Sequence, residues 1–201
     1  MSSHLLLIVA ILGLAYIIGS LPFGFWLVRL IKGIDLRTVG SGGTGATNVK
    51  RTAGSKLAGL TLFLDVAKGA LAVYLAQLLS PPELQAVLAI AAGALAILGH
   101  SRSIFIGFKG GKSVAISLGV FLMLEPLIIS QAIVLGVIII TSTRFVSLGS
   151  IIGAIVAFLL SFLLPNVSWM HQVLFGFAAA YIVWLHRANI QRLRQGSESR
   201  L

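Results

Sequence analysis

The sequence comprises 201 residues, of which 58% are hydrophobic and only 10% are charged. Soluble domains usually carry ~25% charged residues, so this composition excludes a soluble enzyme, a disordered chain and, despite the net charge of +10, a nucleic-acid-binding domain. It predicts an integral membrane protein with one domain over residues 1–201. The chain has no cysteine and five acidic residues. Thiolate chemistry is therefore excluded, and we expect no metal site and no cofactor.

Seven apolar stretches follow one another along the chain and predict an all-α polytopic bundle of membrane helices. They are Leu5–Ile31, Leu57–Leu79, Leu84–Gly99, Val114–Leu124, Leu127–Ser142, Val146–Leu164 and Val167–Leu185. A membrane-spanning helix needs ~20 predominantly apolar residues. The fourth and fifth stretches are shorter, and only Glu125 and Pro126 separate them. They form either two thin spans or one re-entrant hairpin, which gives seven or five spans in total.

The basic residues are distributed asymmetrically. Fourteen of the fifteen Lys and Arg residues lie at the end of, or after, the first, third, fifth and seventh stretches, and the other connections have none. This pattern predicts an external N-terminus and a cytoplasmic C-terminus, with a cytoplasmic face that attracts anionic headgroups and anionic substrates. The remaining cation, Lys68, follows Asp65 by three residues inside the second stretch. An unpaired charge there costs ~2.5–3.5 kcal/mol on insertion scales, so the two are expected to pair.

The first predicted cytoplasmic loop contains a glycine-rich segment, Gly40–Gly45, in which four of six residues are glycine. Glycine lets backbone amides crowd around an anion, and the hydroxyl and amide side chains nearby add neutral donors. Arg51 adds a planar fork that suits phosphate. A flexible linker is the alternative interpretation. The candidate phosphate ligands are Ser41, Gly42, Gly43, Thr44, Gly45, Thr47, Asn48 and Arg51.

The second predicted cytoplasmic loop contributes the candidate substrate-binding residues His100, Gly110 and Gly111, together with Lys112. It is not a nucleotide-binding P-loop, because the Walker A spacing requires a glycine where Ile106 stands. Two glycines and a lysine just before an apolar stretch nevertheless bring amide donors, a helix N-terminus and an ammonium group together around an anion. The alternative is a turn whose lysines only follow the positive-inside pattern.

A third polar group lies near the start of the sixth stretch and at the end of the seventh. Ser147 and Ser150 are three residues apart, as are His186 and Asn189, so each pair is expected on one helix face. A histidine and an asparagine there suit a polyol hydroxyl or a proton. Ordinary helix capping and interfacial polarity are the alternative explanation.

The sequence resembles the bacterial acyl-phosphate-dependent glycerol-3-phosphate acyltransferases over nearly its whole length. The matching stretches are Gly19–Gly24, Asp35–Asn48, Leu64–Gly69, Gly99–Lys112, Phe145–Ser150 and His186–Leu193. The resemblance implies a seven-helix fold with the N-terminus outside. It also implies transfer of a fatty acyl group from acyl phosphate to the sn-1 hydroxyl of glycerol 3-phosphate. The products are lysophosphatidic acid and phosphate, in the first step of phospholipid synthesis.

The resemblance further implies roles for individual residues. Glycerol phosphate would be held by Ser41, Arg51, Lys112, Ser150, His186 and Asn189, and acyl phosphate by the glycine-rich loop with Thr44, Thr47 and Asn48. The expected catalytic residues are Asn48, Lys112, His186 and Asn189. The family usually has Asn in place of Gly43, often Pro in place of Ser103, and Gly in place of Ser113. Because Gly43 has no side-chain donor in place of that Asn, the phosphate cradle depends more on backbone amides.

The mechanism expected from these residues is direct attack by the glycerol hydroxyl. There is no cysteine, no apparent Ser-His-acid set and no H-x-x-x-x-D box in the sequence. The proton passes either to His186 or to a substrate phosphate, and the sequence leaves both open. The alternative function is a small membrane anion or phosphate transporter. That function needs polar groups at mid-membrane and matching helix breaks in the two halves, whereas most polar residues here lie on one predicted face.

Overall fold

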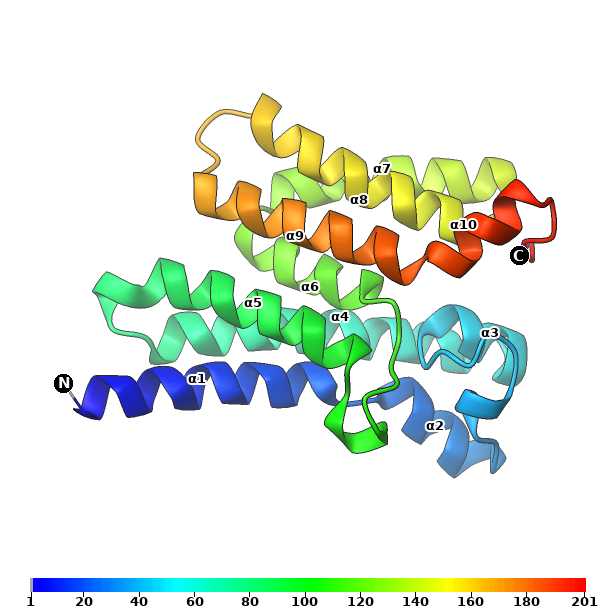
Figure 1. Ribbon diagram of the computed structural model, residues 1–201, viewed down its shortest axis with the longest axis horizontal. Coiled ribbons are helices and arrows are strands. Elements are labelled where there is room, and N and C mark those ends of the chain that lie inside the picture. The colour runs from blue at the N-terminus through cyan, green and yellow to red at the C-terminus, as the bar shows by residue number, and fades with distance from the viewer. Residues whose placement is uncertain (1) are drawn as a thin grey trace. The chain divides into compact units, whose positions relative to one another are not determined.

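The computed structural model describes residues 2–201, apart from the side chains of Ser2 and Ser3. All regular elements in that part of the chain are helices and none is a strand, which confirms the all-helical class. The helices form two compact units, residues 1–123 and 124–201 (Figure 1). Each unit has its own packed helices, and each carries part of the polar residues singled out above.

The first unit contains six α-helices. They are α1 (Ser2–Ser20), α2 (Phe23–Lys32), α3 (Ala46–Ala53), α4 (Ser55–Leu79), α5 (Gln85–Ser101) and α6 (Val114–Leu124), with 3-10 turns at Leu36–Thr38, Pro82–Leu84 and Ile104–Ile106. Helices α1, α4 and α5 pack against one another, and α2 and α3 both pack on α4 (Figure 1). The glycine-rich loop joins α2 to α3, and the second polar loop joins α5 to α6. Both candidate phosphate loops therefore belong to this unit.

Glycines allow the helices of the first unit to approach one another closely. A Cβ atom at Gly19 of α1 would overlap the backbone of Ala96 on α5. In the same way, a Cβ at Gly119 of α6 would overlap the carbonyl oxygen of Val66 on α4. Small residues at such crossings are typical of membrane helices, where close van der Waals packing replaces the hydrophobic effect as the main attraction.

The first apolar stretch is broken rather than continuous. Helix α1 ends at Ser20 and α2 begins at Phe23, because Pro22 lacks the amide that would continue the hydrogen-bond ladder. Residues 4–32 nevertheless count together as one candidate span. Among residues 2–201, five candidate spans are long and apolar enough to cross a bilayer, or six if the bent pair α9 and α10 is one span. Helix α6 has 11 residues and is shorter than a full span, so the count of seven stays a prediction.

The second unit contains α7 (Pro126–Thr143), α8 (Val146–Leu163), α9 (Trp169–Leu185) and α10 (Arg187–Arg194). Helix α8 packs against both α7 and α9, and Gly149 of α8 lies close to the backbone of Gly136 on α7. The chain bends by 58° between α9 and α10, with His186 at the bend. The polar residues of this unit gather at that end, near the C-terminal tail.

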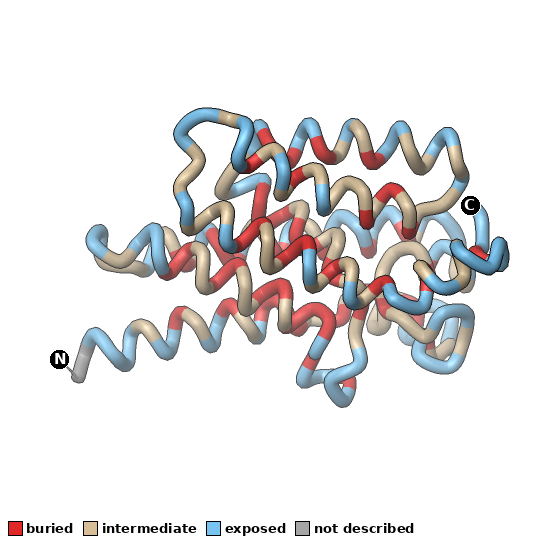
Figure 2. Tube along the Cα trace, turned by 45° about the horizontal axis from the view of Figure 1, so that its top comes forward, coloured by how far each residue is buried: buried red, intermediate tan, exposed pale blue. Residues whose placement is uncertain are grey.

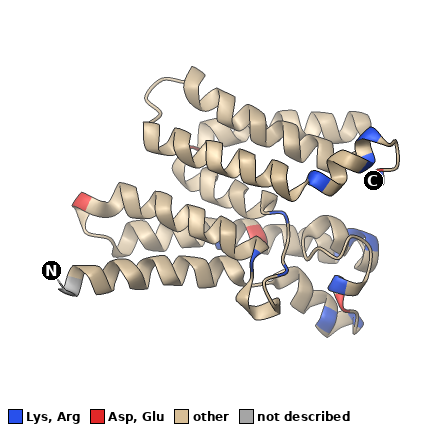
Figure 3. Ribbon diagram, in the orientation of Figure 1, with Lys and Arg blue, Asp and Glu red and all other residues tan. Residues whose placement is uncertain are grey.

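Burial and charge follow the pattern of a membrane protein in each unit. In Figure 2, the N-terminal turns of α1 are exposed although they are apolar, with Leu5 63% and Leu6 71% exposed. Apolar surface of this kind suits contact with lipid rather than water. In Figure 3, most Lys and Arg of the first unit gather at the end that carries α2 and α3, whereas those of the second unit gather near α10 and the tail. Each unit therefore has one basic end.

Candidate active site

Asn48 organises the glycine-rich loop from the first turns of α3. Its Nδ2 atom donates to the carbonyl oxygens of Leu36 (3.3 Å), Val39 (3.1 Å) and Gly43 (2.9 Å), and its Oδ1 accepts from the Ser41 amide (3.0 Å). The side chain is only 3% exposed. Both polar atoms of Asn48 are thus used inside the loop, and the residue shapes the loop.

The loop needs glycine for two different reasons. Gly40 and Gly42 have φ of 59° and 69°, which side chains disfavour, and a Cβ at Gly40 would also overlap Oδ1 of Asn48. Gly24 of α2 is needed for close approach, because a Cβ there would overlap the carbonyl oxygen of Thr44. The loop therefore rests backbone to backbone on α2, and Thr44 is 4% exposed.

The loop presents a row of available amides. The amides of Ser41 and Gly42 are used internally, the second bonding to Val39 O at 3.0 Å. Within residues 2–201, the amides of residues 43–45 donate to no protein acceptor, and they immediately precede α3. Adjacent free amides at the positive end of a helix form an anion site. The hydroxyl of partly buried Thr47 and the exposed guanidinium of Arg51 lie on the same short helix.

An ion pair supports the chain just before this loop. Arg37 donates to Asp35 through Nε (3.0 Å), Nη2 (2.7 Å) and its backbone amide (2.9 Å). The side-chain hydrogen bond from Arg37, helped by the backbone bond, lowers the pKa of Asp35 to about 2. The carboxylate in turn raises the pKa of Arg37. The pair caps the 3-10 turn, so we assign it to the shape of the loop rather than to ligand binding.

The second loop is fastened to the end of α5. The Gly110 amide donates to Ser101 O (3.0 Å) and the Gly111 amide to His100 O (3.2 Å). These two amides were expected to face an anion, but the structure uses them to close the last turn of α5, whose final carbonyls lack helical partners. Lys112 follows directly and lies two residues before the start of α6. In this loop, the lysine is thus the candidate ligand, and the glycines place it.

The predicted pair inside the second apolar stretch is confirmed. Asp65 and Lys68 lie on α4, with Lys68 Nζ 2.8 Å from Asp65 Oδ1, and they are 2% and 3% exposed. The ring of His100, at the end of α5, lies beside them and is also buried. Among residues 2–201, no group of three or more His, Cys, Asp or Glu side chains has the arrangement of a metal site.

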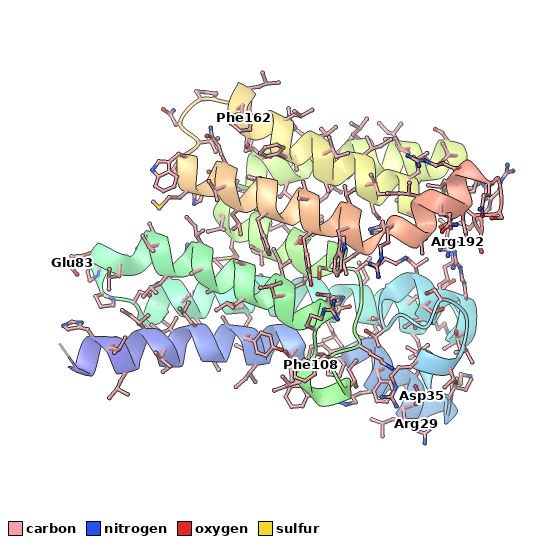
Figure 4. All side chains as sticks on the ribbon, viewed as in Figure 1. Arg29, Asp35, Glu83, Phe108, Phe162 and Arg192 are labelled. Atoms are coloured by element: carbon pink, nitrogen blue, oxygen red, sulfur yellow. The ribbon has the colours of Figure 1, made fainter. Side chains whose placement is uncertain are left out.

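In the second unit, Glu198 of the C-terminal tail joins the polar residues of three segments. Its Oε1 accepts from Ser147 Oγ (2.8 Å) and Asn189 Nδ2 (2.6 Å), and its Oε2 accepts from Arg192 Nε (2.7 Å). We call these four residues the Glu198 cluster, and Figure 4 shows Arg192 on α10 beside the tail. Burial opposes ionisation, but the hydrogen bonds outweigh it and lower the pKa of Glu198.

His186 lies at the bend between α9 and α10. Its Nδ1 is 2.8 Å from Ile182 O, and because a carbonyl only accepts, Nδ1 carries the proton of the neutral ring. Nε2 is then the ring atom that can accept a proton or a hydrogen bond. Asn189 was expected on one continuous helix face with His186, but the 58° bend places it on α10 instead. Both residues are buried, and Ser150 is partly exposed one turn after Ser147.

Comparison with known proteins decides the family. The family model for glycerol-3-phosphate acyltransferase matches residues 8–196. The chain belongs to the glycerol-3-phosphate acyltransferase family. A glycerol-3-phosphate acyltransferase of Desulforudis audaxviator is 45% identical over 97% of this chain and 96% of its own length. Glycerol-3-phosphate acyltransferase 1 of Deinococcus radiodurans is 45% identical over 94% of this chain and 92% of its own length.

Solved structures agree with this membership. The chain is similar to the crystal structure of PlsY (YgiH), an integral membrane glycerol 3-phosphate acyltransferase, in its glycerol 3-phosphate form. The TM-score is 0.88 at 36% identity, covering 96% of this chain and 95% of that one. The lysophosphatidic acid form of PlsY matches with a TM-score of 0.85 at 34% identity. As a member of the glycerol-3-phosphate acyltransferase family, the chain is a multi-pass membrane acyltransferase.

Two departures from the family pattern have structural explanations. Ser113 has φ of 60°, a conformation that favours glycine, but its buried hydroxyl donates to Ile97 O at 2.8 Å and compensates. Ser103 Oγ donates to Ser20 O at 2.5 Å, which ties the loop to the end of α1. Both serines therefore add hydrogen bonds that hold the second loop against neighbouring helices.

Sequence reasoning missed one residue that contacts the candidate site residues. Glu198 lies beyond residue 196, where the family match ends, and it was counted only among the five acids. Its isolation among four arginines and no other acid after residue 186 was a usable signal. The hydrogen bond from Ser147, 51 residues away, could not be predicted from the local sequence.

Proposed function

We infer that this chain transfers a fatty acyl group from acyl phosphate to the sn-1 hydroxyl of glycerol 3-phosphate, with lysophosphatidic acid and phosphate as products. The observation that carries the donor assignment is the row of available amides at residues 43–45, directly before α3. Such a site binds a phosphate group without a metal ion and without a nucleotide-binding motif. Membership of the acyltransferase family and the similarity to glycerol 3-phosphate-bound PlsY support the acceptor assignment.

The two phosphate groups are assigned to different parts of the first unit. The glycine-rich loop, through the amides of residues 43–45 and the hydroxyls of Thr44 and Thr47, cradles the acyl phosphate, whereas Gly42 and Asn48 hold that loop in shape. Ser41, Arg51 and Lys112 bind the phosphate of glycerol 3-phosphate. Lys112 is positioned by the backbone of Gly110 and Gly111, which is bonded to the end of α5 at His100. The basic side chains offset the repulsion between the two anions.

The glycerol end of the acceptor is assigned to the second unit. Ser150, His186 and Asn189 hold its hydroxyl groups, and the Glu198 cluster fixes Asn189. The single domain over residues 1–201 stays a prediction.

The reaction needs no covalent enzyme intermediate. The sn-1 oxygen attacks the acyl carbonyl carbon, a new ester C–O bond forms, and the bond between that carbon and the phosphate oxygen breaks. The hydroxyl proton passes to a substrate phosphate, with Nε2 of His186 as the alternative acceptor. Holding both reactants in line supplies ~7–11 kcal/mol of barrier reduction. The backbone amides of the glycine-rich loop stabilise the charge on the departing phosphate, and Lys112 holds the phosphate of the acceptor.

We propose that the active site lies on the cytoplasmic face of the inner membrane, with the N-terminus outside and seven helices crossing the bilayer. The single basic end of each unit supports this orientation (Figure 3). A reporter fused to the C-terminus is expected to be active only in the cytoplasm. A C-terminal reporter active only outside the membrane would overturn the orientation and leave the reaction untouched.

Phosphate release by the purified chain tests the reaction directly. With acyl phosphate alone we expect little release, and addition of glycerol 3-phosphate should start release and form lysophosphatidic acid in equal amount. The rate should be the same in EDTA, because the phosphate ligands assigned here are amides and cations; a rate restored by magnesium would contradict this. No release with acyl phosphate or acyl-CoA, together with phosphate flux into vesicles, would favour a transporter.

A further inference from the structure

Three buried titratable side chains of the first unit take no direct part in the proposed reaction. Asp65, Lys68 and His100 are 2%, 3% and 6% exposed. Asp65 and Lys68 lie on α4, and His100 lies at the end of α5. Charged groups inside a membrane bundle are costly, so their placement next to a substrate loop calls for an explanation in function as well as in stability.

Lys68 fixes one end of this arrangement at the break in the first span. Its Nζ lies 2.8 Å from Asp65 Oδ1, donates to Leu21 O at 2.6 Å and stands 5.6 Å from the centre of the Phe23 ring. The Leu21 carbonyl is at the break before Pro22, where the helix ladder is interrupted. The ammonium therefore satisfies an open carbonyl and holds the Asp65 carboxylate at that level.

His100 fills the space between this ion pair and the second loop. Its Nδ1 is 3.6 Å from Asp65 Oδ1 and makes no hydrogen bond within the described residues. On the other side of the ring, a Cβ at Gly111 would overlap Nε2, so the ring lies directly against the Gly111 backbone. Moving the ring towards Gly111 is blocked by backbone, and moving it the other way is blocked by Asp65.

The main chain and the ring of His100 support the loop separately. The carbonyl of His100 accepts the Gly111 amide at 3.2 Å, and a Cβ at Gly110 would overlap that same carbonyl. A side-chain substitution at His100 keeps the carbonyl and removes only the ring. The effect of the ring on the loop is therefore measurable without deleting the hydrogen bond.

We propose that Asp65 and His100 are positioning residues for glycerol 3-phosphate. The Asp65–Lys68 pair fixes the position of the His100 ring, and the ring fixes the position of the Gly111 backbone. Gly111 in turn places the adjacent Lys112 against the acceptor phosphate. This inference rests on the proposed function, in which Lys112 binds that phosphate. It differs from a ligand role for His100, because the ring acts through the loop and does not touch the substrate.

Steady-state kinetics of the full-length purified chain test the proposal. His100→Ala should raise KM for glycerol 3-phosphate by about tenfold or more, because displacements of about 1 Å cost up to two orders of magnitude. KM for acyl phosphate should stay within about twofold, since the glycine-rich loop is left intact. His100→Gln should recover most of the loss, because its amide nitrogen occupies the place of Nε2.

The matched control is His171→Gln. His171 is also paired with a carboxylate, with Nδ1 2.6 Å from Glu125 Oε1, but it is at the start of α9 and supports no assigned substrate loop. Its kinetic constants should equal those of the native chain. A rise in KM for glycerol 3-phosphate in His171→Gln as large as that in His100→Ala would overturn the proposal, as would unchanged KM in His100→Ala.

A second variant covers the case in which His100→Ala does not fold. Asp65→Leu combined with Lys68→Met removes both charges together, and such replacements of a buried pair are often neutral or stabilising. We expect a folded protein with the same selective rise in KM for glycerol 3-phosphate. A folded double variant with native KM would show that the pair serves stability alone. An inactive native chain would instead refute the proposed function itself, which separates the two failures.

Discussion

The glycine-rich loop of the first unit and the Glu198 cluster of the second unit hold their polar groups by different means. In the loop, Asn48 bonds to partners at most 12 residues away, and glycines with positive φ form the turns between them. In the cluster, Glu198 bonds to Ser147 across 51 residues. A local loop keeps its shape as long as its own segment folds. A cluster made by a returning tail depends on the whole path of that tail.

The tail is held in its returning path at several points. Gly196 has φ of 67°, which turns the chain after α10, and the Leu201 amide donates to Arg144 O at 2.8 Å. Arg200 lies 5.4 Å from the centre of the Phe145 ring. Distant substitutions in the tail are therefore expected to reach Asn189, whereas the first unit should respond mainly to changes within its loops.

The largest expected effect lies in the first unit. Lys112→Ala should lower kcat/KM by at least about 100-fold, as expected for loss of one preorganised charge donor. The protein should still insert, because the loop fastenings at Gly110 and Gly111 remain. Lys109→Ala, which removes an exposed lysine of the same loop, is the control and should be nearly native. Equal losses in both variants would mean that only the total charge of the loop matters.

The next effect sharpens the contrast with the second unit. Glu198→Gln keeps the shape of the side chain, but its amide nitrogen cannot accept a hydrogen bond, so one of the two acceptor atoms is lost and the hydrogen bonds that remain lose the carboxylate charge. We expect about a tenfold loss of activity together with a lower melting temperature. Glu83→Gln, at an exposed acid of the first unit, should change neither. Native activity in Glu198→Gln would show that the Glu198 cluster does not contribute to the active site.

The pH dependence of stability follows from the same carboxylate. The pKa of Glu198 is lowered from 4.5 in the folded chain, because its hydrogen bonds outweigh burial. Its contribution is therefore complete above pH 4.5 and is lost as pH falls through the lowered value. The melting temperature of the native chain should fall in that acidic range, and the Glu198→Gln variant should lack this pH-dependent fall.

A third prediction concerns the proton at His186. If a substrate phosphate takes it, His186→Asn should lower activity but keep the acidic limb of the pH–rate profile, because the second phosphate pKa is ~6. We expect this outcome. Loss of the acidic limb in the variant would assign the proton to Nε2 of His186. The native profile serves as the reference.

The smallest expected effect tests how far the loop depends on backbone. A Cβ at Gly43 would meet Ser41 Oγ at an ordinary 3.6 Å, and Gly43 is not among the left-handed glycines. Gly43→Asn should therefore leave activity within about twofold of native or raise it slightly, because a donor is added without strain. Gly40→Asn, at φ of 59° and against Asn48, should be strongly impaired. Equal effects would refute the distinction between the two glycines.

Local sequence patterns determined the helices and the loops of this protein. Continuous apolar stretches predicted every long helix, since a helix in lipid must satisfy its own backbone and needs no distant partner. The spacing of Asp65 and Lys68 predicted their ion pair, because residues three apart share a helix face. The glycine-rich segment predicted a tightly turned loop, because its conformation depends mainly on its own residues, whereas phosphate binding by that loop stays a prediction.

Tertiary structure alone decided which distant groups meet. No local pattern placed the ring of His100 between Asp65 and Gly111, which requires α4 and α5 to pack at one height. Nor did any pattern bring Glu198 to Ser147. Periodicity and hydropathy report on neighbours along the chain, whereas these contacts arise when buried polar groups without water must find partners wherever the folded chain brings them.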